Sequence, residues 1–395
     1  MKVICDRSAL LEGLNLVGAA AAVRTPRLQL TCIKIVATKT AGAGEMTLAA
    51  TDAEISIKMS LSHVDVHQPG EVLIPAEKLR QIVGAEEGEA TLTLEAEGDA
   101  LHIRGMDAHF KILGYPAADF PPLPDFRSIV EGGTDKGGVE KIRAVMTHPA
   151  GSLSGLVSKT LFATAKETSR YSINGVLFKR DGKRLEMVAT DGRRLAIART
   201  NLAGGEKDAK PVSCIVPVKA LNVLQRMVQD NEENVQIGIT ENQILFSFGT
   251  AASPGRAVLT SNLIEGTFPP YEDAIPKDFD KKVTFDRDVL LSAVRRAALL
   301  TNEESKGVKM TFHGRTKKVE VASRAPEMGE STITVDLTAY EGDPIDIGFN
   351  PTFLSDALKV LPDSDVVMEL KASSKPGVIR SGTEFTYVVM PVGLN

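Results

Sequence analysis

The sequence contains no tryptophan, and aromatic residues make up only 5% of its 395 positions. So small a supply of aromatic rings argues against a base-stacking platform for single-stranded nucleic acid. No apolar run approaches the roughly 18 residues that a membrane-spanning helix needs, which excludes a membrane-spanning role. The N-terminal segment has neither the long apolar core nor the cleavage site of a signal peptide. We therefore expect a cytoplasmic protein.

Cysteine is also scarce. Cys5, Cys32 and Cys214 are widely spaced and form no CxxC pair. This pattern predicts buried structural thiols, and it argues against a disulfide framework or a zinc knuckle. The six histidines show no HExxH spacing, and no glycine-rich phosphate loop is present. We accordingly expect no metal and no cofactor.

The charge balance excludes a generally basic coat for nucleic acid, because 46 basic residues face 51 acidic ones and the net charge is −5. Any contact with a polyanion must use a local basic surface.

The chain does contain a long internal repeat. Two copies open with a short strand, an aspartate N-cap and an amphipathic helix. The caps are Asp6 and Asp286, and the apolar positions that follow are spaced as on one helical face. The segment 144–165 fits the same place in a middle copy, after a glycine- and charge-rich stretch at 131–138 that has the composition of a linker.

Further along each copy the spacing persists. Asp52 and Asp191 lie 139 residues apart in related TD turns, and Pro75, Pro217 and Pro351 each precede a second helix. The repeat predicts an α+β fold of three similar domains, each with two helices and two small antiparallel sheets. The expected boundaries are 1–128, 139–279 and 281–395.

The expected helices carry cationic side chains on their outward faces. The stripe in the middle copy is Lys219, Asn222 and Arg226, and the third copy has Thr352, Ser355 and Lys359 in the same slots. The full cationic set on these helices is Lys78, Arg80, Lys219, Arg226, Arg295 and Arg296. Each could be part of a solvated face. Together, in a net-negative chain, they indicate a surface that contacts phosphates without reading sequence.

Several motifs resemble a known family. They are SRYSINGVLF at 169–178, VATDGRRLA at 188–196, LIEGTFPPYEDAIP at 263–276, TNEESKGV at 301–308 and YVVMPVGL at 387–394. In this order, on a three-fold repeat, the chain resembles the bacterial sliding clamps, the beta subunits of DNA polymerase III. The resemblance implies a head-to-tail homodimer that forms a six-domain ring around double-stranded DNA. It implies a processivity factor with no catalysis of its own.

The resemblance also implies sites. A pocket for a short peptide motif would bind the DNA polymerase III catalytic subunit, the clamp loader, repair polymerases and mismatch-repair proteins. Its matching positions are Ile173, Thr190, Gly192, Arg194, Leu195, Pro269, Val388, Met390 and Pro391. Arg24 and Lys166 match DNA-contacting loops, although Glu167 beside the latter should weaken its contact. The dimer seam would use Phe110 and Ile112 on an edge strand, and Leu299 and Leu300 after a helix. The C-terminus departs from the family's pattern at Val392, Gly393 and the extra Asn395.

Two rival interpretations remain open on the sequence alone. One is a metal-dependent nucleic-acid-processing enzyme that uses Asp52 and Asp191 as ligands, although the third copy has Arg324 at the equivalent position. Aspartate as a turn residue after a strand is the simpler interpretation. The other is a purely structural array of repeats.

Overall fold

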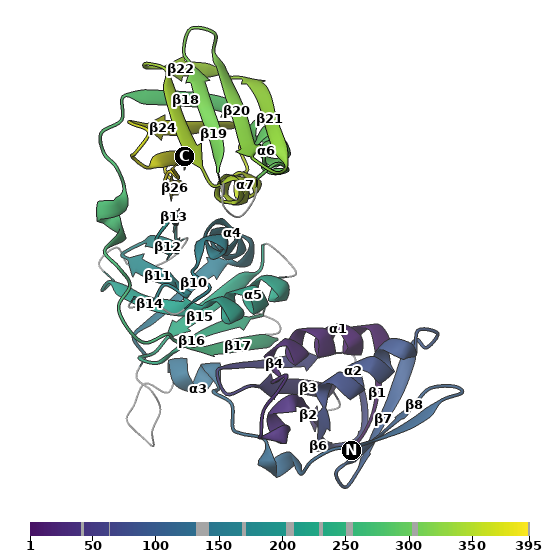
Figure 1. The fold of residues 1–395 in the computed structure, drawn as a ribbon. Coiled ribbons are helices and arrows are strands. Elements are labelled where there is room, and N and C mark those ends of the chain that lie inside the picture. The colour runs from purple at the N-terminus through teal and green to yellow at the C-terminus, as the bar shows by residue number, and fades with distance from the viewer. Residues whose placement is uncertain are drawn as a thin grey trace. The chain divides into compact units, whose positions relative to one another are not determined.

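A computed structural model describes residues 1–40, 43–62, 64–131, 142–167, 171–202, 209–228, 232–249, 256–301 and 307–393 (Figure 1). The fold is α+β, and every strand pair of these residues is antiparallel, which confirms the predicted fold class. The strands group into two compact units. The first comprises Met1–Ser154 with Lys219–Leu263, and the second comprises Gly155–Leu202, strand β14 (Val212–Pro217) and Ile264–Asn395.

The first unit contains two sheets. The five-stranded sheet has the order β5 (Asp65–Gln68), β1 (Lys2–Asp6), β7 (Thr91–Glu97), β8 (Ala100–Arg104) and β9 (His109–Leu113). The eight-stranded sheet has the order β10 (Ala144–Pro149), β15 (Asn234–Ile239), β16 (Gln243–Phe248), β17 (Ala257–Asn262), β4 (Ile55–Leu61), β3 (Ala43–Thr51), β2 (Cys32–Thr40) and β6 (Gly70–Pro75). Its helices are α1 (Arg7–Val17), α2 (Ala76–Ala85), α3 (Phe126–Glu131) and most of α5 (Val218–Met227).

The second unit also contains two sheets. The nine-stranded sheet has the order β14 (Val212–Pro217), β11 (Gly175–Asp181), β12 (Arg184–Thr190), β13 (Arg194–Asn201), β26 (Phe385–Val389), β25 (Gly377–Ser381), β24 (Asp365–Leu370), β18 (Lys281–Asp286) and β22 (Ala339–Glu341). The four-stranded sheet has the order β21 (Gly329–Asp336), β20 (Lys318–Ala325), β19 (Val308–His313) and β23 (Ile345–Phe349). Its helices are α6 (Arg287–Ala298) and α7 (Pro351–Val360), while α4 (Ala150–Thr160) spans both units.

The two largest sheets extend further than the sequence predicted. Strand β4 of the first copy pairs with β17 of the second, and β13 of the second pairs with β26 of the third. A sheet that begins in one copy therefore continues into the next copy through each of these pairings. We call these two pairings the first junction (β4–β17) and the second junction (β13–β26). The predicted domain boundaries remain predictions.

The helices begin where the sequence predicted. The Asp6 and Asp286 carboxylates each accept a hydrogen bond from the backbone N–H three residues on, at 2.8 and 2.9 Å, and so cap α1 and α6. On these helices the apolar positions Leu10, Leu14, Leu290 and Val294 are fully buried. Local sequence therefore determines both helix starts and the faces that pack on the sheets.

The cysteine side chains test the prediction of buried structural thiols. All three cysteines are buried, as predicted, and burial together with the nearby Asp6 raises the pKa of Cys5 to about 12. A thiol held protonated in this way is a poor nucleophile.

Among the described residues, no helix is long and apolar enough to cross a bilayer.

Candidate functional site

The second junction begins at a tight turn, Thr190–Arg194. The Asp191 Oδ1 atom accepts hydrogen bonds from the backbone N–H groups of Arg193 and Arg194, at 2.9 and 3.0 Å. Thr190 Oγ1 donates to the Arg194 carbonyl at 2.7 Å and accepts from Gly192 N–H at 3.1 Å. Gly192 has φ +83°, a conformation that glycine adopts without penalty. The TDGRR sequence therefore encodes the turn locally.

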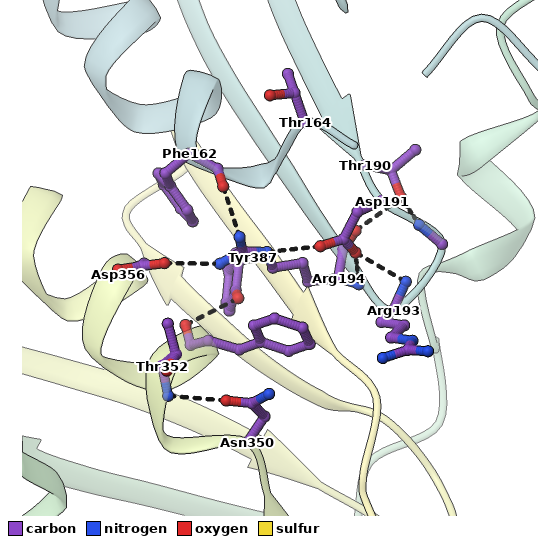
Figure 2. A network of polar contacts seen from close by, with 12 residues as sticks. Phe162, Thr164, Thr190, Asp191, Arg193, Arg194, Asn350, Thr352, Asp356 and Tyr387 are labelled. Carbon is purple, nitrogen blue, oxygen red and sulfur yellow. Dashed lines mark hydrogen bonds and ion pairs between the residues drawn. The ribbon is translucent and has the colours of Figure 1, made fainter. Parts of the chain in front are cut away.

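Arg194 projects from this turn and uses all three of its guanidinium nitrogens (Figure 2). Nε donates to Asp191 at 3.0 Å, one terminal nitrogen donates to Asp356 on α7 at 3.0 Å, and the other donates to the Phe162 carbonyl at 2.6 Å. The guanidinium also lies over the Phe353 ring, 4.4 Å from its centroid. Burial opposes the charge, but Asp356 and Asp191 outweigh it and hold the pKa of Arg194 above its ordinary value. Arg194 thus ties the turn to α7.

One face of the same sheet is apolar and covered by other residues of the chain. Leu195 and Val388 are register partners across the junction and are only 4% and 2% exposed. They belong to a buried cluster with Leu177, Val188, Ile197, Ile215, Tyr271 and Val378, against which Ile264, Phe268, Ile275 and Phe279 pack. The segment around Pro269 therefore covers this face. Its Tyr271 hydroxyl donates to Glu186, and burial raises the pKa of Tyr271.

The other predicted pocket residues surround these elements. Met390 is 45% exposed, and its backbone N–H donates to the Arg193 carbonyl at 2.9 Å. Ile173 accepts from the Ala165 N–H at 3.0 Å, which places it beside the end of α4. Pro391 borders a hollow of about 620 Å³ lined also by Val392, Gly393, Lys309, Asp346, Ile347, Gly348, Ser373 and Ser374. Leu394 and Asn395 lie outside the described residues, as do residues 302–306 of the TNEESKGV motif at 301–308.

The first junction has the same turn. Asp52 Oδ1 accepts from the N–H groups of Glu54 and Ile55, at 2.9 and 2.8 Å, and its other oxygen is bound by Lys219 Nζ. Neither Asp52 nor Asp191 presents a carboxylate free for a metal, because backbone N–H groups and a cation already occupy both. The two residues also belong to different compact units. Their use as metal ligands was a wrong alternative, and the turn interpretation is the correct one.

The predicted DNA-contacting cations are all exposed on the surface. Two of them are neutralised, since Lys219 pairs with Asp52 and Arg80 pairs with Glu77 at 2.9 Å. Lys78 donates to Gln81 at 3.4 Å. The other five form no ion pair with any residue of the described ranges, and they are Arg24, Lys166, Arg226, Arg295 and Arg296. Within the first unit, Arg80 and Arg226 line one hollow of about 260 Å³ with residues of α1 and α2.

One detail of the sequence interpretation was wrong. Ser355 is 7% exposed, so it does not continue the polar stripe predicted for α7, where its small side chain packs inward. Ile112 is 8% exposed in the single chain, and its place in the dimer seam stays a prediction. Phe110 is half-buried on the same strand, while Leu299 after α6 is 73% exposed and Leu300 half-buried.

Sequence reasoning missed Phe162, Phe353 and Asp356, which complete the environment of Arg194. Asp356 lies 162 residues from Arg194, and no local pattern connects the two. The signal that the sequence does offer for Asp356 is its place on the helix that begins at Pro351 in the third copy.

The sequence and the fold are similar to those of known proteins. Family models of the DNA polymerase III beta subunit match the chain with the N-terminal domain at residues 1–124, the central domain at 148–270 and the C-terminal domain at 272–393. A beta sliding clamp from Synechocystis is 30% identical over the full length of both chains. A sliding clamp structure from Bacillus subtilis covers 100% of both chains at 27% identity with a TM-score of 0.87. One from Pseudomonas aeruginosa, bound to griselimycin, has 28% identity, full coverage of both chains and a TM-score of 0.86.

Proposed function

The chain belongs to the DNA polymerase III beta subunit family, and from that membership we propose how its surfaces serve a sliding clamp. It is a processivity factor of DNA replication and not an enzyme. In the proposed mechanism the chain acts in the cytoplasm. Two copies close into a ring around double-stranded DNA, and a peptide pocket tethers the catalytic subunit, the clamp loader, repair polymerases and mismatch-repair proteins.

The repeated strand pairing supports ring closure. At the first junction β4 pairs with β17, and at the second junction the equivalent strands β13 and β26 pair in the same register. In the third copy the counterpart of β4 and β13 is β21. In the first copy the counterpart of β17 and β26 is β9. Both are edge strands of their sheets. An edge strand exposes unpaired backbone groups, so β21 of one copy and β9 of the other complete the pattern head to tail.

The exposed side chains near these edges fit such a seam. Leu299 ends α6, which packs against β21, and its exposure in the single chain is what an interface residue requires. Phe110 lies on β9 itself. Ile112 would contribute through the core beneath β9, because its side chain is already buried there.

DNA contact in this proposal is weak and independent of sequence. Six exposed cations, Lys78 and the five named above, have no ion pair in the described ranges and supply positive charge to phosphates, and no bidentate base-reading pattern accompanies them. Retention must then come from the closed ring and not from charge.

One experiment separates topology from electrostatics. The full chain is loaded onto circular duplex by its clamp loader with ATP and then washed at high salt. Because salt screens charge but does not open a ring, the protein should stay on the circle and leave when the circle is cut once. As a control, Arg24→Ala should weaken loading with little effect on retention afterwards. Equal retention on circular and open linear DNA would show that charge, not enclosure, holds the protein.

A further inference from the structure

Two histidines meet on the five-stranded sheet, away from the DNA-contacting and peptide-binding residues proposed above. His102 lies on β8 and His109 on β9, in the hairpin that ends at the sheet edge. His102 Nδ1 is 2.9 Å from His109 Nε2, and the rings are stacked with centroids 5.2 Å apart. Strand register explains the contact, since His109 pairs with Arg104 and His102 pairs with Lys111, which makes the histidines diagonal neighbours.

The outer nitrogen of His102 is informative. His102 Nε2 is buried and has no hydrogen-bond partner among the described groups, while Glu97 Oε2 lies 3.8 Å away. A carboxylate at this side favours the tautomer with the proton on Nε2, which leaves a lone pair on Nδ1. That lone pair points at His109 Nε2. A metal-binding histidine is oriented in the same way, with its far N–H directed at a carboxylate.

We propose that His102 Nδ1 and His109 Nε2 bind a divalent metal ion of borderline softness, Zn²⁺, with Glu97 orienting His102. Zn–N bonds of about 2.0–2.1 Å in tetrahedral geometry need the two nitrogens about 3.3 Å apart. The two nitrogens now face each other across the 2.9 Å contact, so both rings must turn toward a common point to share the ion, and His109 is the more exposed of the two. Water would complete the coordination, and imidazole donors select Zn²⁺ over Mg²⁺ or Ca²⁺.

Charged groups of both signs surround the pair. Glu95 and Glu97 are the nearby acids, and Arg104, Lys111 and Lys2 the nearby bases; Glu95 lies 3.8 Å from Arg104 and 3.9 Å from Lys2. Glu97 is the carboxylate that faces the histidines. A bound cation would cross-link β9, the edge strand, to β8. The site uses none of the proposed DNA-contacting or peptide-binding residues, although His109 lies on β9, the strand proposed for the dimer seam.

A carboxylate cluster lies in the same unit and has different chemistry. Oxygen atoms of Glu86, Glu89 and Asp107 lie within 4.8 Å of one another. Oxygen-only ligands prefer hard cations, so excess Mg²⁺ in the buffer masks any binding of Zn²⁺ to these carboxylates without competing for imidazole. The cysteines are buried and offer no accessible thiolate.

The test is calorimetric titration of the untagged full-length chain with ZnCl₂ in a buffer that contains excess MgCl₂. One Zn²⁺ per chain is expected. His109→Gln, which alters an exposed side chain, should lower the affinity at least about tenfold, and Glu97→Gln should lower it about tenfold through the lost orientation of His102. His67→Gln is the matched control, because His67 is an exposed histidine in the same unit, 3.2 Å from Asp65, and should leave the affinity unchanged.

Unchanged Zn²⁺ affinity in His109→Gln would overturn the assignment, as would loss of binding in the His67 control or complete competition by Mg²⁺. His102→Asn tests the second ligand, and its thermal unfolding midpoint shows whether the largely buried site still folds. If that variant misfolds, the His109 and Glu97 variants remain decisive because both side chains are exposed.

Discussion

The two junctions have the same backbone and different side chains. Thr51–Ile55 and Thr190–Arg194 form the same turn, with an aspartate that caps two backbone N–H groups and a threonine that bonds across the turn. The strands that follow pair in the same register, so that Ile55 faces Ser261 as Arg194 faces Val389. Repetition therefore preserved the main-chain architecture in detail.

The paired side chains differ in polarity. Leu195 and Val388 at the second junction correspond to Ser56 and Thr260 at the first, and exposed Met390 corresponds to Asn262. The side-chain amide of Asn262 donates a hydrogen bond to the Ala53 carbonyl at 3.1 Å. Leu195 and Val388 are themselves buried, so the apolar side chain that the second junction exposes to a peptide is Met390. An apolar peptide gains free energy only where apolar surface is exposed. The two junctions thus have equivalent backbones, and their side chains favour the second as the place for an apolar peptide.

The ionic ties differ as well. Arg194 is 10% exposed and bonds two carboxylates, whereas Lys219 is 46% exposed and bonds one. An ion pair that is largely exposed contributes little to stability, and breaking a largely buried one leaves uncompensated charge. The second junction should thus depend on its cation much more than the first.

Removing the cation at each junction tests this contrast, and we expect the largest effect here. Arg194→Met should destabilise the second junction by about 3 kcal/mol, because Asp191, Asp356 and the Phe162 carbonyl lose their donor. Lys219→Met at the first junction should cost less than about 1 kcal/mol. Native-state hydrogen exchange of the β13 and β4 amides reads each cost separately. Equal losses at the two junctions would contradict the comparison.

The polarity difference predicts where a peptide ligand binds. Griselimycin, which is bound in the Pseudomonas aeruginosa relative, serves as the probe. Met390→Ala should weaken its binding about tenfold, since the loss of buried apolar contact removes on the order of 1–2 kcal/mol. The matched variant Asn262→Ala at the first junction should leave the affinity unchanged in calorimetry. A stronger effect from Asn262→Ala would move the site to the first junction.

The two units should also respond differently to acid. Burial lowers the pKa of His148 on β10 below its ordinary value of 6.5. The folded state therefore disfavours the protonated ring, and stability that is present above pH 6.5 is lost as the pH falls through the lowered folded-state pKa. The second unit has only the exposed His313. Scanning calorimetry at pH 7.5 and 5.0 should show a smaller acid shift for His148→Asn than for the parent; an unchanged shift would exclude His148 as the cause.

The smallest expected effect concerns the turns themselves. Ala53 has φ +77° where the second turn has Gly192 at φ +83°. Ala53→Gly should relieve strain and stabilise the first turn by less than about 1 kcal/mol, and Gly192→Ala should cost about 1 kcal/mol. A Cβ atom at Gly192 would meet no atom within 4 Å, so the cost is conformational and not steric. Thermal midpoints of the two variants should shift in opposite directions.

Local patterns predicted what local physics determines. Asp6 and Asp286 were identified as caps because their hydrogen bonds span three residues, whereas the edge position of β9 was expected from the family resemblance. The pairings β4–β17 and β13–β26 were beyond prediction from patterns, because the register between distant strands depends on the whole sheet. Asp356 and the His102–His109 contact were missed for the same reason.

The strand joint of the second junction also has a mechanical direction. Five residue pairs join β13 to β26, and the hydrogen bonds of an antiparallel ladder lie perpendicular to the strands. A pull along the strands loads all the rungs at once, as in shear, whereas a pull across them opens one rung at a time, as in a zipper. The joint therefore resists sliding far better than peeling, and any force that parts it does so at the lowest cost from one end, at Arg194 or at Ala198.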